Sequence, residues 1–100
     1  MKGKRSFEPG DMVASFTGEQ GMVLSLKEYS MIRERLREGR RPGHYFAPGC
    51  CRSPDYITCM PVLFDDSTFD LMRVMNVRRI QYPGREKRAH IRGILDDYCV

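Results

Sequence analysis

The segment from residue 56 to residue 64 constrains the fold most strongly, because it is apolar at nearly every position (Tyr-Ile-Thr-Cys-Met-Pro-Val-Leu-Phe). Its longest uninterrupted apolar run, from Cys59 to Phe64, has six residues and is far shorter than the ~18 that a membrane span needs. A run of this length favours a β-strand that is at least partly covered on both faces. Pro61 cannot donate to a β-ladder, so we expect either an edge strand or a bulge near Met60 and Pro61.

The N-terminal part of the chain predicts a β-hairpin. Residues 11–17 alternate in character, with every second residue from Met12 to Phe16 on one face, as a half-buried strand requires. The glycines at both ends of Gly18-Glu19-Gln20-Gly21 tolerate positive φ, which favours a tight turn. We therefore expect a returning strand over residues 22–26.

A helix is expected after this hairpin. Ser25 and Glu28 have the spacing of a capping box, and apolar residues recur at helical intervals from Leu26 to Leu36. Gly39 suits the position that ends a helix, so the pattern predicts a helix over residues 26–38. Residues 39–55 contain three glycines and three prolines, which predicts a long loop that is either functional or disordered.

The remaining elements complete a single domain over residues 1–100, with residues 1–8 as a flexible N-terminal arm. The expected elements after the loop are, in order, a strand over 56–64, a turn at 65–68, a strand over 69–77, a short strand over 78–82 and a helix over 85–95. The order of elements predicts a mainly β (α+β) fold, a five-stranded antiparallel barrel with an inserted helix and a C-terminal helix.

Two motifs resemble those of known small barrels. Phe7-Glu8-Pro9-Gly10-Asp11-Met12-Val13, followed by Gly18-Glu19-Gln20-Gly21-Met22-Val23, resembles the start of SH3-like barrels of the KOW, Tudor and CarD kind. Val62-Leu63-Phe64-Asp65-Asp66 is similar to a turn between later strands of Tudor-like modules. The resemblance implies an SH3-like barrel into which the helix over 26–38 is inserted.

The first hairpin is also similar to that of the MazF/PemK toxin endoribonucleases, which are SH3-like barrels as well. In that family an Arg-Pro pair follows the glycine turn, where this chain has Met22 and Val23. The family's catalytic hydroxyl follows a Val-Pro motif, whereas Thr58 precedes Pro61 here. The resemblance therefore implies shared architecture, and we predict no catalytic residues; a toxin-type endoribonuclease remains a less favoured alternative.

The charged residues suggest a ligand. The chain has 17 Lys and Arg against 13 Asp and Glu, a formal net charge of +4, and 13 of its cations are arginine. Arginine binds phosphate through paired hydrogen bonds and stacks on bases, so arginine clusters with nearby aromatic residues favour RNA or DNA as the partner. The predicted nucleic-acid-binding residues are Arg33, Arg37, Arg40, Arg41, Tyr45, Phe46, Arg78, Arg79, Arg85, Lys87 and Arg88.

Two other interpretations of this surface remain open. The arginines can simply form a solvated face, balanced on the first helix by Glu34 and Glu38. The seven methionines, together with the aromatic residues, can instead form a surface for a protein partner, as in a protein–protein interaction or assembly subunit.

Cysteine usage favours free thiols. Residues 1–11 lack the apolar stretch of a signal peptide, so we expect the cytoplasm, a reducing compartment, for Cys50, Cys51, Cys59 and Cys99. No C-x-x-C spacing occurs, and we predict no metal site, no cofactor and no membrane partner. The alternatives left open are a metal role of these thiols, a redox pair of Cys50 and Cys51, or one of these two thiols activated by His44.

Overall fold

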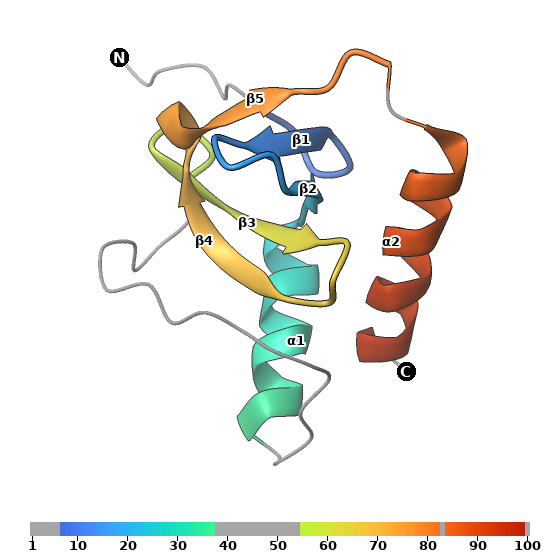
Figure 1. The fold of residues 1–100 in the computed structure, drawn as a ribbon. Coiled ribbons are helices and arrows are strands. Elements are labelled where there is room, and N and C mark those ends of the chain that lie inside the picture. The colour runs from blue at the N-terminus through green and yellow to red at the C-terminus, as the bar shows by residue number, and fades with distance from the viewer. Residues whose placement is uncertain (1–6, 38–54, 83, 100) are drawn as a thin grey trace.

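The computed structural model describes residues 7–37, 55–82 and 84–99, which form five β-strands and two α-helices (Figure 1). In chain order the elements are β1 (Met12–Ser15), β2 (Gln20–Val23), α1 (Leu26–Arg37), β3 (Cys59–Phe64), β4 (Phe69–Arg73), the 3-10 turn η1 (Val74–Asn76), β5 (Val77–Arg79) and α2 (Arg85–Cys99). Most of the predicted loop, residues 39–54, lies outside the described residues.

The five strands form one sheet in the order β4-β3-β2-β1-β5, and all neighbouring strands are antiparallel. This confirms the predicted mainly β (α+β) fold, with one helix inserted between the second and third strands and another at the C-terminus. Among the described residues β4 and β5 lie at opposite edges and do not pair, so the sheet is not closed and a complete barrel is not confirmed.

The predicted strand over residues 69–77 is interrupted. β4 ends at Arg73, and η1 follows, with the Val74 N–H donating to the Thr58 carbonyl at 2.9 Å. The interruption is required because the chain leaves one edge of the sheet at β4 and must join β1 at the other edge. The last strand therefore covers Val77–Arg79, not 78–82, and the C-terminal helix continues to Cys99.

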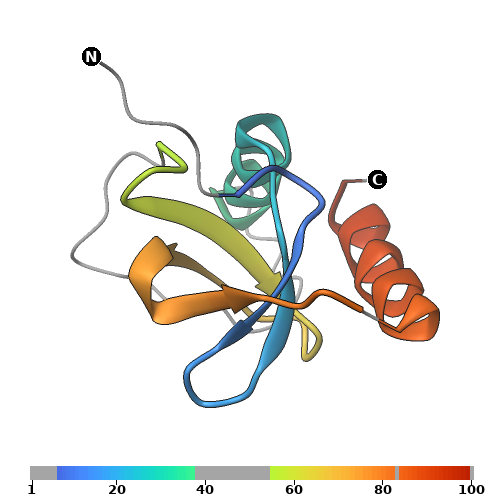
Figure 2. The ribbon, with the colours of Figure 1, turned by 90° about the horizontal axis from the view of Figure 1, so that it is seen from above.

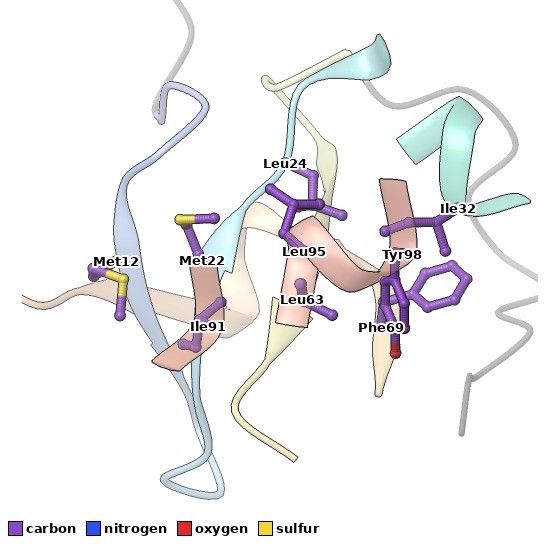
Figure 3. Packing of buried hydrophobic residues seen from close by; sticks show 9 residues of the cluster. All are labelled: Met12, Met22, Leu24, Ile32, Leu63, Phe69, Ile91, Leu95 and Tyr98. Atoms are coloured by element: carbon purple, nitrogen blue, oxygen red, sulfur yellow. The ribbon is translucent and has the colours of Figure 1, made fainter. Parts of the chain in front are cut away.

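Each face of the sheet carries its own hydrophobic core. On the face covered by α1 and α2, side chains of both helices pack on the strands, as Figure 3 shows for Ile32 of α1 and Ile91 of α2. This core comprises Met12, Met22, Leu24, Ile32, Leu63, Phe69, Ile91, Leu95 and Tyr98. The core on the other face comprises Phe7, Val13, Val23, Tyr56, Met60, Val62 and Phe64. Every residue of β3 is buried, which confirms that this strand is covered on both sides.

The start of α1 follows its sequence signal. The Ser25 hydroxyl accepts from the Glu28 N–H at 3.1 Å, and the Glu28 carboxylate accepts from the Ser25 N–H at 2.9 Å. The predicted capping box is therefore confirmed. Phe7 belongs to the segment 1–8 that is expected to be a flexible arm. Its side chain is instead buried in the core on the face of the sheet away from the helices.

Pro61 lies neither in an edge strand nor at a bulge. β3 is the second strand of the sheet, between β4 and β2, and its pairing with β4 continues without interruption from Cys59 to Leu63. The Leu24 N–H donates to the Pro61 carbonyl at 2.9 Å, but proline has no N–H to donate in return. The hydroxyl of Tyr56 donates to the Leu24 carbonyl instead, so the acceptor that the proline leaves open is satisfied.

We predict that Tyr56→Phe lowers the free energy of unfolding by about 1–3 kcal/mol, because the buried Leu24 carbonyl loses its donor. Urea denaturation measures the change. Tyr82→Phe is the matched control, since that ring is 92% exposed, and should change stability by less than about 0.5 kcal/mol. Equal stability of Tyr56→Phe and the wild type would show that the hydroxyl does not compensate for the proline.

The two glycines of the first turn have different roles. Gly18 has a φ of +93°, as expected for the turn, whereas Gly21 lies within β2 and is buried. A Cβ on Gly21 would lie 2.7 Å from Cγ1 of Val62 and 2.8 Å from the carbonyl oxygen of Leu63. The expectation of a turn glycine at position 21 is therefore wrong, because the close approach of β2 and β3 requires a residue without a side chain there.

Gly21→Ala should accordingly reduce the free energy of unfolding by about 1–3 kcal/mol, since the backbone of β3 must shift. Gly93→Ala is the control, because a Cβ there meets nothing within 4 Å. Within α2 that substitution should stabilise the protein by about 1 kcal/mol through helix propensity. Thermal unfolding of both variants tests the difference in sign, and a stable Gly21→Ala protein would contradict it.

Candidate nucleic-acid interface

The predicted basic residues of the C-terminal part lie on consecutive elements. Arg78 and Arg79 belong to β5, and Arg85, Lys87 and Arg88 belong to the first turns of α2. Figure 2 shows β5 and the chain that follows it crossing on the viewer's side of β1 and β2 towards α2. The structure thus places this basic group along an edge strand and the helix that it leads to.

The predicted binding residues from Arg33 to Phe46 lie only partly within the described residues. Arg33 lies on α1, and Arg37 is the last residue of that helix, with its side chain outside the described part. Arg40, Arg41, Tyr45 and Phe46 also lie outside the described residues. The structure therefore describes all five predicted residues on β5 and α2, and of the predicted residues between Arg33 and Phe46 it describes the side chain of Arg33 alone.

Arg33 packs on its own helix. Its guanidinium lies 5.6 Å from the centroid of the Tyr29 ring, which itself meets the Phe69 ring edge-on at a centroid distance of 6.2 Å. Burial raises the pKa of Tyr29, and the neighbouring Arg33 partly opposes that shift. Arg33 therefore has a packing role at this place, beside any contact with a ligand.

Arg79 is held by the N-terminal segment. One of its guanidinium nitrogens lies 3.0 Å from a carboxylate oxygen of Asp11, and its guanidinium carbon lies 5.1 Å from the centroid of the Phe7 ring. These contacts fix the start of β1 against β5. The charge of Arg79 is consequently shared with a carboxylate and is less available to a phosphate.

Lys87 fastens α2 to the turn between β3 and β4. Its amine lies 2.7 Å from a carboxylate oxygen of Asp65, and the His90 ring hydrogen-bonds with the Asp65 carbonyl at 2.9 Å. At the other end of α2, the Tyr98 hydroxyl donates to the Ser67 carbonyl. The Arg35 Nε donates to the Tyr98 carbonyl at 3.0 Å, which satisfies an end carbonyl of the helix.

Three arginines of β5 and α2 differ from Arg79 and Lys87 in their contacts. Arg78, Arg85 and Arg88 are exposed, and within the described part of the chain none of them forms an ion pair. Tyr82 lies between them in the chain and is 92% exposed. The sequence places Tyr82 close to the basic residues of β5 and α2, but the predicted nucleic-acid-binding residues do not include it.

Other site chemistries find less support. In residues 7–37, 55–82 and 84–99 no group of three or more His, Cys, Asp or Glu residues is placed to hold a metal ion. Cys59 is a buried residue of β3 and forms no disulfide within the described part of the chain. His44, Cys50 and Cys51 lie outside the described residues, as does the side chain of Cys99.

The hydroxyl of Thr58, compared above with the catalytic hydroxyl of the toxin endoribonucleases, stabilises a turn. Its Oγ1 donates to the Asp55 carboxylate at 2.9 Å, and the same carboxylate accepts from the backbone N–H groups of Thr58, Ile57 and Cys59. These hydrogen bonds, that of the Thr58 N–H first, hold the pKa of Asp55 well below its usual range. A carboxylate that is stabilised in its charged form is a poor general base.

The chain was compared with protein-family models, with curated proteins and with solved structures, and none of the three comparisons finds a match. The helices of the described residues are also too short or too polar for any of them to cross a membrane.

Tyr98 attaches α2 to the turn between β3 and β4, and we predict that its ionisation lowers the stability of the protein at alkaline pH. Burial, with the Asp66 charge as a smaller cause, raises the pKa of Tyr98 from its ordinary 10.0 to about 12. Between these values the unfolded chain loses this proton and the folded protein keeps it, so the free energy of unfolding falls as the pH rises from 10 towards 12. Urea denaturation over this range should show a smaller loss for Tyr98→Phe. Identical slopes would contradict the raised pKa.

Proposed function

We propose that this protein is a small non-catalytic module that binds RNA or DNA through phosphate contacts. The observation that carries the proposal is the set of three exposed arginines without an ion pair among the described residues, Arg78, Arg85 and Arg88, on β5 and the first turns of α2. Guanidinium groups bind phosphate oxygens in pairs of hydrogen bonds. A guanidinium group that is not already in an ion pair can do so without first displacing a carboxylate.

The other members of the cluster support the site indirectly. Arg79 and Lys87 are ion-paired with Asp11 and Asp65, so they fix β5 and α2 and thereby position the three exposed arginines. The formal net charge of +4 favours approach of a polyanion. In this proposal binding depends on salt, because each phosphate contact releases counterions.

The triple variant Arg78→Gln, Arg85→Gln, Arg88→Gln tests the proposal. Fluorescence anisotropy at several salt concentrations should show weaker binding, and the slope of log affinity against log salt should decrease by about 2 for a single-stranded ligand. The reason is the loss of up to three phosphate contacts.

A charge-matched control separates specific contacts from net charge. Lys27→Gln, Arg73→Gln, Arg92→Gln removes the same charge from α1, β4 and the later turns of α2, outside the predicted binding residues, and it should leave most of the slope intact. An unchanged slope in the first variant, or an equal decrease in the control, would overturn the assignment of Arg78, Arg85 and Arg88.

A protein-interaction or assembly module is the second proposal. It is supported by two exposed apolar side chains near the junction of β1, η1 and β5: Phe16 is 80% exposed and Met75 is 82% exposed. Association with a protein that is insensitive to salt, without retention of nucleic acid on purification, would favour it over the first proposal.

The resemblances to known barrels contribute unequally. Five antiparallel strands with an inserted helix support an SH3-like architecture as a proposal, although the sheet is not closed. Met22 and Val23, which stand where the toxin endoribonucleases have Arg-Pro, are both buried and cannot contact RNA. A toxin-type nuclease therefore gains no support.

A further inference from the structure

We infer that the ligand of this module is single-stranded and lies along the edge strand β5, with unpaired bases stacked on Phe16 and Tyr82. This inference rests on the proposed binding of nucleic acid and adds the class of ligand and its path.

Phe16 and Tyr82 lie beyond opposite ends of the ladder between β1 and β5. Ser15 pairs with Val77, and Phe16 follows Ser15 directly in the chain. At the other end the Ile80 N–H donates to the Met12 carbonyl at 2.9 Å, and Tyr82 lies two residues further on. Phe16 and Tyr82 therefore flank the exposed edge that β5 forms.

These two rings differ from the other aromatic residues that the structure describes. Phe16 is 80% exposed and Tyr82 is 92% exposed. The remaining described aromatic residues are buried or, for Tyr29, half-buried: Phe7, Tyr29, Tyr56, Phe64, Phe69 and Tyr98. An exposed ring offers a face on which any base can stack, which is how proteins bind single strands without sequence preference.

Arg78, which forms no ion pair within the described ranges, lies on β5 between the two ends of the ladder. Arg78 pairs through its backbone with Ala14 in the middle of the ladder, and its side chain is exposed. Its neighbour Arg79 is bound to Asp11. Arg78 is thus placed to contact the phosphates of a strand whose bases reach Phe16 on one side and Tyr82 on the other.

The span fits a short strand. The six residues from Val77 to Tyr82 are joined by five Cα–Cα steps and reach at most about 18 Å, a length that a single strand of a few nucleotides can follow. β5 is an edge strand, so among the described residues no further strand covers its outer side. A duplex offers no unpaired base faces along its length, so stacking on both rings requires a single strand.

Phe16→Leu and Tyr82→Leu test the inference, because leucine keeps an apolar side chain and removes the ring. The probes are a labelled oligouridylate and an oligothymidylate of about ten nucleotides, and a mixed-sequence DNA duplex of the same length. Each variant should bind the single strands about tenfold more weakly, with the salt slope unchanged. Tyr82→Phe keeps the ring and should bind like the wild type, and Leu26→Ala, at an exposed apolar residue of α1, is the matched control.

The outcomes separate this inference from the proposed function. Preferential binding of single strands that both leucine variants weaken supports the inference. Equal binding of duplex and single strand, with both leucine variants unaffected, overturns it and leaves the arginine contacts standing. A loss that Tyr82→Phe shares with Tyr82→Leu also overturns the stacking on Tyr82. No binding of any probe at low salt overturns the inference and the proposed function together, and it favours a protein partner.

Discussion

The burial of β3 on both faces is the constraint on which the rest of the structure depends. Its six residues are all buried, with Leu63 in the core under the helices and Val62 in the core on the other side. A strand in this position needs a partner along each edge, which β2 and β4 provide. Pro61 would leave the Leu24 carbonyl without a donor, and the Tyr56 hydroxyl supplies one. The Leu24 carbonyl inside the sheet therefore has a hydrogen-bond donor even though β3 contains a proline opposite it.

This central strand also determines where the candidate site can be. With β2 and β4 on either side of β3, the last strand can join the sheet only at an outer edge, and it does so beside β1. The chain then continues to α2, whose side chains pack over the helix-covered core. The basic segment is thus carried on an exposed edge and on the first turns of a helix, both held by ion pairs of their neighbours. The arginines that are not needed for this attachment are the ones we assign to a ligand.

The candidate site is only partly readable from the sequence. Clusters of arginine are visible there, but no pattern distinguishes Arg79, which Asp11 holds, from Arg78, which is free of ion pairs among the described residues. Asp11 and Arg79 are far apart in the chain, and only the pairing of β1 with β5 brings them together. The prediction for Phe16 differs most from the structure. Its alternation with Met12 predicts a buried residue, yet β1 ends at Ser15 and the ring is exposed.

The sequence by itself determined the features that depend on neighbours in the chain. These are the capping box of Ser25 and Glu28, the turn at Gly18, the burial of β3 and the residues at which both helices begin. Local hydrogen bonds and the hydrophobic pattern are sufficient for them. Only the tertiary structure decided that η1 breaks the chain between β4 and β5, that Gly21 must lack a side chain, and which of the described cations form ion pairs. Each of these depends on groups that meet across the sheet, and their distance in the chain leaves no local signal.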